Sequence, residues 1–159
     1  MPQRNPTLRE RLLHLAFRII RPVTLGVKAM ILRNGDTEVY LVRHTYVPGW
    51  RMPGGGVEPG DSVTRTLHKE LAEECNITLT GEPEFVGIFH NTFATKRDHI
   101  VLYVCRDFTQ SGPKVPDMEI AEAGFFPVDA LPRGTVDSAR ARIRDVIEGR
   151  EPPESWQAP

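Results

Sequence analysis

Runs of β-branched and other apolar residues predict strands at five places in the chain. Residues 25–32 form the first run and residues 38–42 the second. Between them stands Asn34-Gly35-Asp36. An Asn-Gly pair in that position is a strong hairpin signal, because both residues tolerate a positive φ. Three further strands are predicted at residues 85–90, 100–108 and 125–128.

Apolar residues at helical spacing predict three helices. In the first, over residues 8–20, Thr7 and Glu10 form a capping box at the start, and Pro22 stops the helix at its end. The other two cover residues 62–75 and 136–147. In the last helix we expect Ala139, Ile143, Val146 and Ile147 to face inward and Arg140, Arg142 and Arg144 to face mostly outward.

Helices therefore alternate with groups of strands along the chain. This order predicts an α/β fold, in which a mixed sheet lies between helices. Pro- and Gly-containing segments, such as residues 110–117, read as loops. We expect a helical extension at residues 1–22, one domain at residues 23–150, and a mobile tail at residues 151–159, which holds three prolines.

Composition narrows the function classes. The 159 residues carry a net charge of -1, so no overall basic field would recruit nucleic acid. The two cysteines, Cys75 and Cys105, do not form a CxxC pair, so a zinc site is not expected and both read as free thiols in the core of a cytoplasmic protein. Residues 12–20 are too short a run for a transmembrane helix, and no stable membrane association is expected.

One segment carries the candidate chemistry. Residues 53–61 read Pro-Gly-Gly-Gly-Val-Glu-Pro-Gly-Asp, a loop whose backbone can approach an ion closely. In the helix that follows, Glu70, Glu73 and Glu74 stand at i, i+3 and i+4, so their carboxylates share one face. A divalent cation such as Mg²⁺ or Mn²⁺ would relieve their repulsion. An isolated Glu pair would read as solvated helix surface, but loop and helix together indicate a metal site that clamps phosphates.

Residues 55–77 resemble the Nudix box, G-x5-E-x7-R-E-U-x-E-E-x-G-U, where U is a bulky aliphatic residue. The matching positions are Gly55, Glu70, Leu71, Glu73, Glu74 and Ile77. Three positions depart from the pattern: Asp61 replaces Glu, Lys69 replaces Arg and Asn76 replaces the second Gly. Asp and Lys keep the charge, and Asn tolerates the left-handed conformation that ends a helix. The likeness covers about residues 25–147.

The resemblance implies a Nudix-type α/β/α sandwich, to which the N-terminal helix is an addition. It also implies Mg²⁺- or Mn²⁺-dependent hydrolysis of a phosphoanhydride bond in a nucleoside diphosphate linked to another moiety. By the same resemblance, the metal ligands are the carbonyl of Gly54 and the carboxylates of Glu70, Glu73 and Glu74. Lys69 would orient one of these carboxylates, and Asp61 would support the ligands without binding the metal itself.

A further acidic residue and several basic ones complete the expected site. Many relatives supply a carboxylate from the loop before a late strand; Glu119 stands in a comparable place and would be an extra ligand or the general base, with Glu122 as a weaker competitor. The candidate substrate-binding residues are Arg43, Arg51, Gly55 and Gly56. The guanidinium fork fits phosphate. His44, Tyr46 and Trp50 either stack a nucleobase or pack at the end of the hairpin.

Two other functions fit parts of the sequence. The three departures from the box would suit a module that binds a nucleotide without cleaving it. The Arg-flanked helix over residues 8–20 would suit a membrane-surface or scaffold protein, or a helix that joins two subunits into a homodimer. Because the glutamate positions are intact, the hydrolase is the favoured interpretation. Its small-molecule substrate would be a nucleoside triphosphate, a nucleotide sugar such as ADP-ribose, or a dinucleoside polyphosphate.

Overall fold

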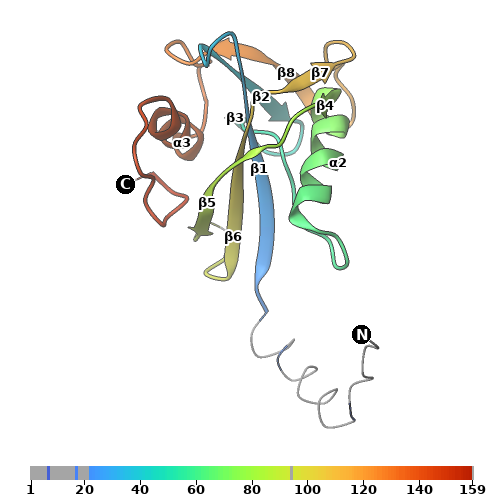
Figure 1. Ribbon diagram of the computed structural model, residues 1–159, viewed down its shortest axis with the longest axis vertical. Coiled ribbons are helices and arrows are strands. Elements are labelled where there is room, and N and C mark those ends of the chain that lie inside the picture. The colour runs from blue at the N-terminus through green and yellow to red at the C-terminus, as the bar shows by residue number, and fades with distance from the viewer. Residues whose placement is uncertain (1–6, 8–16, 18–21, 94, 159) are drawn as a thin grey trace.

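The computed structural model describes Thr7, Phe17 and residues 22–93 and 95–158. The helix predicted over residues 8–20 therefore falls almost entirely outside the described residues. The described strands are β1 (Thr24–Arg33), β2 (Glu38–His44), β3 (Trp50–Arg51), β4 (Ile77–Leu79), β5 (Glu84–Asn91), β6 (Asp98–Cys105), β7 (Phe108–Gln110) and β8 (Ile120–Pro127), and the helices are α2 (Val63–Cys75) and α3 (Asp137–Ile147) (Figure 1). Within these ranges, neither helix is long and apolar enough to cross a membrane.

The main sheet is mixed, with strand order β3-β2-β1-β6-β5, and β8 also pairs with β2. The predicted hairpin between β1 and β2 is confirmed. The residues of its turn, Asn34, Gly35 and Asp36, have positive φ of 56°, 68° and 64°. β1 runs parallel to β6 over its whole pairing, but it pairs with β2 only at Leu32↔Val39 and Arg33↔Glu38. Beyond these two pairs, β1 and β2 therefore separate. We call the resulting gap between the two strands the fork.

The glycine-rich loop lies beside β1 in this fork. The amides of Val27 and Ala29 donate to the carbonyls of Gly55 (2.9 Å) and Pro53 (3.0 Å), and the amide of Val57 donates to Leu25 (2.7 Å). The loop is thus hydrogen-bonded to β1 as a neighbouring strand would be, although it is not a regular strand itself. This pairing holds its backbone in place next to α2.

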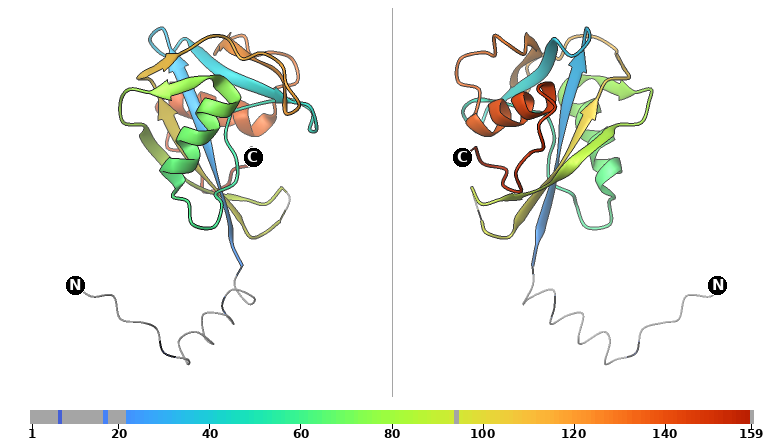
Figure 2. Two further views of the ribbon diagram at one scale, coloured as in Figure 1. Left: turned by 90° about the vertical axis from the view of Figure 1, so that its right-hand side faces the viewer. Right: turned by 60° about the vertical axis from the view of Figure 1, so that its left-hand side comes forward.

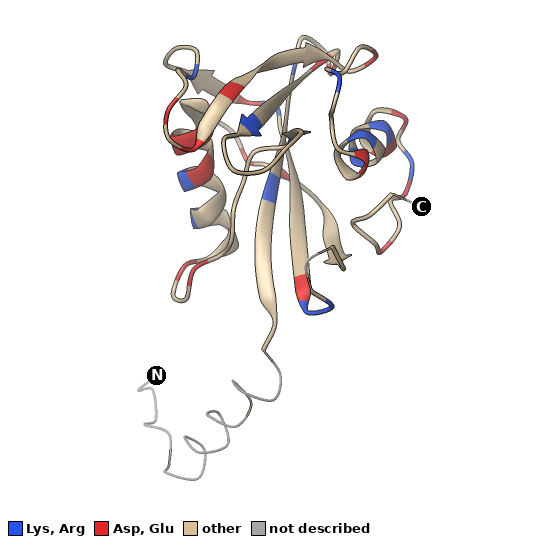
Figure 3. Ribbon diagram, turned by 180° about the vertical axis from the view of Figure 1, so that it is seen from behind, with Lys and Arg blue, Asp and Glu red and all other residues tan. Residues whose placement is uncertain are grey.

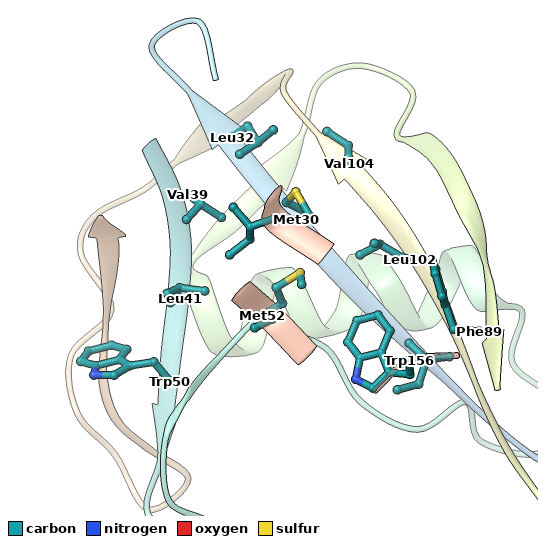
Figure 4. Packing of buried hydrophobic residues seen from close by; sticks show 13 residues of the cluster. Met30, Leu32, Val39, Leu41, Trp50, Met52, Phe89, Leu102, Val104 and Trp156 are labelled. Carbon is teal, nitrogen blue, oxygen red and sulfur yellow. The ribbon is translucent and has the colours of Figure 1, made fainter. Parts of the chain in front are cut away.

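Helices cover the two faces of the sheet, so the predicted α/β sandwich is confirmed (Figure 2). Successive side chains of a strand point to opposite faces. Val27, Ala29 and Ile31 of β1 accordingly belong to a cluster with α2. Met30 and Leu32 belong to a second cluster, with α3, in which Trp156 lies near Phe89 and Leu102 (Figure 4). Both cysteines are free and buried, as expected.

Strand boundaries late in the chain differ from those predicted. β6 ends at Cys105, and β7 instead pairs with β4, with Gln110 opposite Ile77, so residue 110 does not belong to a loop. Three-residue strands carry too little pattern to be recognised in a sequence. β8 begins at Ile120 rather than at residue 125, because its pairing with β2 continues past Glu122 and Gly124, which interrupt the apolar run.

The orientation predicted for Arg142 in α3 is wrong. Its side chain is buried, with the residue 1% exposed, and its guanidinium pairs with Asp145 at 3.0 Å and donates to the carbonyl of Ser155 at 3.1 Å. Ile147, predicted to face inward, is 38% exposed. The chain that follows α3 folds back over the helix, so Arg142 lies inside because of a contact that helical periodicity does not contain.

The C-terminal segment, residues 154–158, packs against β5. The amide of His90 donates to the carbonyl of Glu154 at 2.8 Å, and the amide of Trp156 donates to His90 at 3.0 Å. Trp156 is only 8% exposed. The expectation of a mobile tail, based on its prolines, does not account for these contacts.

Candidate active site

Helix α2 presents its glutamates to the glycine loop. Ser62 caps its start by accepting from the amide of Arg65 at 3.1 Å. Asn76 ends it with φ of 55°, the left-handed conformation expected where the box has Gly. Leu67 and Leu71 are buried on the side of the helix that packs on the sheet, next to Glu74, which is also buried. Figure 3 shows acidic residues along α2 and on the strand and loop beside it.

Glu74 is the most enclosed of the three box glutamates, at 3% exposed. The amide of Gly54 donates to its Oε2 at 2.8 Å, and Nε2 of His44 lies 2.7 Å from its Oε1. His44 is itself buried, at 6% exposed. Both carboxylate oxygens therefore have a hydrogen-bond partner from the protein, and the orientation of Glu74 is set before any ligand binds.

Glu70 lies directly beneath the loop. A Cβ built on Gly55 would come within 2.8 Å of the carboxyl carbon of Glu70, so a side chain at this position would displace the Glu70 carboxylate. Burial raises the pKa of Glu70, and the neighbouring charges of Glu74 and Glu73 raise it further. The fold thus holds the partly desolvated carboxylate of Glu70 close to two like charges, which disfavours its charged form unless a cation is present.

Lys28 is a site residue that the sequence interpretation missed. Its Nζ donates to the carbonyls of Gly54 at 2.6 Å and Met52 at 3.1 Å. Burial lowers the pKa of Lys28, while the charge of Glu74 raises it. A single lysine within the apolar run of β1 was the available signal. The carbonyl of Gly54, a predicted metal ligand, already accepts from Lys28 and has a second lone pair.

Glu119 reaches this site from the loop before β8, a segment distant from α2 along the chain. The amide of Thr45 donates to its carbonyl at 2.9 Å, which holds the residue beside His44. The carboxylates of Glu119 and Glu74 and the His44 ring offer ligand atoms that lie within 4.8 Å of one another. Nδ1 of His44 is buried and has no hydrogen-bond partner among the described residues. Glu122 is instead paired with Arg43 at 2.7 Å, so it is not the acidic residue that the strand pairing brings to the site.

These donors fit a divalent cation. Carboxylate oxygens from α2 and from the loop before β8 meet near a backbone carbonyl, and hard oxygen ligands of this kind suit Mg²⁺ or Mn²⁺. Glu73 is exposed on the same helix and extends the acidic face. His44 adds a nitrogen that can orient a carboxylate or bind a metal directly.

Three further residues were predicted to belong to the site: Asp61, Lys69 and Gly56. Asp61 forms an ion pair with Arg65 at 3.2 Å, at the start of α2. Lys69 is exposed, and its charge lowers the pKa of Glu70 as the last of several influences. Gly56 forms a bridge with Gly26 of β1 and is also exposed. Among the contacts of the described residues, none of the three has a hydrogen bond to a box glutamate, as His44 has, or to the carbonyl of Gly54, as Lys28 has.

The aromatic candidates differ in burial and in their neighbours. Trp50 is buried and packs edge-on against Phe126, with ring centroids 4.8 Å apart, so it packs at the hairpin end rather than stacking a base. Tyr46 is 70% exposed, with its hydroxyl 3.4 Å from the Glu119 carboxylate. At the end of β5, the side-chain amide of Asn91 donates to the carboxylate of Asp98 in β6 at 2.6 Å.

A cavity of about 830 Å³ lies on the α3 side of the sheet. Lys28 and Arg51 line it together with residues from the start of α3 and from the C-terminal segment. Nε of Arg51 has no hydrogen-bond partner among the described residues. Lys28 connects this cavity to the glutamates, because it contacts the carbonyl of Gly54 while the amide of Gly54 contacts Glu74.

Comparisons with known proteins agree with this geometry. The family model described as the NUDIX domain matches residues 23–147. A Bacillus subtilis (strain 168) protein, provisionally named as an 8-oxo-dGTP diphosphatase, is 24% identical over 124 residues, 77% of this chain and 79% of that protein. The crystal structure of a MutT NUDIX hydrolase from Burkholderia pseudomallei has a TM-score of 0.67 at 24% identity, covering 77% of this chain and 97% of that one.

A third relative has a bound ligand. The NUDIX domain of Shewanella oneidensis NrtR, solved in complex with ADP ribose, has a TM-score of 0.71 at 19% identity, covering 91% of this chain and 99% of that one. The match to the family model spans most of the chain and contains the loop and all three box glutamates. This chain therefore belongs to the Nudix hydrolase family and is a Nudix pyrophosphohydrolase.

Proposed function

We propose that this pyrophosphohydrolase cleaves a phosphoanhydride bond in a nucleoside diphosphate linked to a further moiety, with Mg²⁺ or Mn²⁺ as its cofactor. The observation that carries the proposal is the placement of Glu70 and Glu74 against the glycine loop with Glu119 beside them. Bound there, a divalent cation would polarise the phosphate and offset the charge that develops on its oxygens.

The roles of the residues follow from their positions. The proposed metal ligands are the carbonyl of Gly54 and the carboxylates of Glu70, Glu73 and Glu74. Glu119 is exposed next to this group, so it can accept a proton from an attacking water molecule as the general base. Lys28 and Arg51 bind the phosphates from the cavity side, where Lys28 is half-buried and Nε of Arg51 is buried.

The substrate class is supported by the cavity and the relatives. Ligand cavities in proteins usually have volumes of about 300–1,000 Å³, and the cavity beside Lys28 has about 830 Å³. The Bacillus subtilis relative is named for 8-oxo-dGTP, and the Shewanella oneidensis relative binds ADP ribose. Both molecules join a nucleoside to a chain of phosphates, and this shared part is what we expect the chain to recognise.

A substrate panel tests the proposal. The purified protein is incubated with nucleoside triphosphates including 8-oxo-dGTP, with ADP-ribose and other nucleotide sugars, and with dinucleoside polyphosphates, each in Mg²⁺, Mn²⁺ or EDTA. Products are separated by chromatography, so that the cleaved bond is identified. We expect cleavage at a phosphoanhydride bond of at least one compound in metal and none in EDTA.

Matched variants assign that activity to the site. We expect Glu74→Gln and Glu70→Gln each to lower kcat by about 100-fold or more. The control is Glu82→Gln, the same substitution at an exposed residue that lies in the loop after β4. Turnover of no compound in either metal would overturn the proposal, as would turnover that survives both site substitutions.

A further inference from the structure

The C-terminal segment is fixed to the free edge of the main sheet. β5 is the last strand in the sheet order, and Ser155 forms a parallel bridge with His90 of β5. The carbonyl of Ser155 also accepts from the buried guanidinium of Arg142, which ties the segment to α3. Backbone groups at an unpaired edge are ready to bind an extended chain, and here the segment that holds Ser155 pairs with the His90 end of that edge.

Two side chains complete the attachment. The ring of Trp156 packs edge-on against Phe89, with centroids 5.5 Å apart, in the cluster beneath α3. Oε1 of Gln157 accepts from the amide of Thr92 at 3.1 Å and from its hydroxyl at 3.0 Å, and Nε2 of Gln157 donates to Oδ1 of Asn91 at 2.6 Å. The Gln157 amide therefore has a defined orientation at the tip of β5.

The same two side chains line the cavity that contains Lys28 and Arg51. The cavity thus has two chemically different parts. Lys28 and Arg51 supply positive charge suited to phosphate. Trp156, Gln157 and Asn91 supply an aromatic surface and neutral amides. Nε2 of Gln157 carries two N–H groups, and among the described residues it donates one of them, to Asn91.

We propose that the C-terminal segment is a specificity element, in which Gln157 binds the uncharged heteroaromatic group of the substrate while Trp156 holds the segment against the cavity. This inference rests on the proposed function, because that function places the phosphates of the same substrate at Lys28 and Arg51. A nucleobase fits this end of the cavity, since its polar edge pairs with amide groups and its ring packs on apolar side chains. Gln157 is then a residue that discriminates between bases, and the tail is a structural part of the site.

Nucleoside diphosphate binding, measured in EDTA so that no turnover occurs, tests this inference. Trp50→Phe leaves Trp156 as the single tryptophan, whose fluorescence then reports on the cavity. The probes are ADP, GDP, CDP and UDP, with inorganic pyrophosphate as the ligand that lacks a base. We expect at least one nucleoside diphosphate to change the Trp156 emission and to bind more tightly than pyrophosphate.

The Gln157→Ala variant, made in the same background, separates base recognition from phosphate binding. We expect it to weaken binding of the preferred nucleoside diphosphate by about twofold to tenfold, the loss of one hydrogen bond, and to leave pyrophosphate affinity unchanged. Deleting residues 154–159 should abolish the preference among bases. Glu151→Gln, at an exposed residue just before the segment, is the matched control. Because Gln157 is outside the hydrophobic clusters, its variant tests the inference even if the deletion fails to fold.

The outcomes separate the two proposals. If nucleotides are cleaved in metal but Gln157→Ala keeps the full preference among bases, the tail is not a specificity element and the proposed function stands. Unchanged Trp156 emission with every nucleoside diphosphate also overturns the inference. If no compound is cleaved, yet base preference depends on Gln157, the site binds nucleotides without hydrolysing them and the proposed function fails.

Discussion

Replacing His44 by leucine removes the side chain that contacts the buried carboxylate of Glu74. The two side chains are 5% and 4% exposed, and Nε2 lies 2.7 Å from Oε1. Removing one partner of a buried polar pair that includes a charge costs about 3–5 kcal/mol. Because Glu74 keeps its bond from the amide of Gly54 at 2.8 Å, we expect a loss of about 3 kcal/mol, at the lower end of that range.

Urea unfolding in EDTA at neutral pH measures this loss. A double-mutant cycle with Glu74→Gln isolates the pair. In the Glu74→Gln background, His44→Leu should cost less, about 1 kcal/mol, because a buried neutral amide without a partner is less costly than a buried carboxylate without one. His44→Gln, whose amide can still donate to Glu74, is the conservative control and should retain most of the stability. An unfolding free energy for His44→Leu within about 0.5 kcal/mol of the wild type, the usual spread of surface changes, would refute the reasoning.

Three further predictions concern the loop and its neighbours. Gly54→Ala should lower the unfolding free energy by about 2 kcal/mol or more, because Gly54 has φ of 126° and a Cβ there would overlap the carbonyl of Val27; Gly56→Ala, where a Cβ has open space, should cost far less in the same urea titration. Lys28→Met should raise KM about tenfold, the effect of one charge-assisted hydrogen bond, and an unchanged KM in steady-state assays would exclude phosphate binding by Lys28. Burial raises the pKa of Glu70, so its neutral form is favoured in the fold and its contribution to stability is lost as pH rises through that raised pKa. In EDTA, the Tm of Glu70→Gln relative to wild type should therefore increase from pH 4.5 to pH 7.5, and an equal difference at both values would contradict this.

Local patterns in the sequence were sufficient for α2 and its surroundings. Caps and glutamate spacing are properties of neighbouring residues, so Ser62, Asn76 and the shared face of Glu70 and Glu74 could be read without the fold. The Asn34-Gly35-Asp36 hairpin is also local, because its backbone angles depend on those residues themselves.

Contacts between distant segments decided the rest. The fork between β1 and β2 gives the glycine loop its place, and the pairing of β2 with β8 brings Glu119 beside His44. Neither pairing is visible in any local window. The roles of Lys28 and of the C-terminal segment arise in the same way, since Lys28 contacts a loop about 25 residues away along the chain and Gln157 contacts a hairpin about 65 residues away.

The sequence by itself determined the family, the helix that carries the acidic face and the glycines that let the loop approach it. The tertiary structure alone determined which of those carboxylates are buried, what orients them and what lines the cavity. The physical reason is that spacing along a helix or turn depends on backbone geometry, which nearby residues control. Burial and hydrogen bonding depend instead on which remote segments pack together, as the buried Arg142 and the tail over β5 demonstrate.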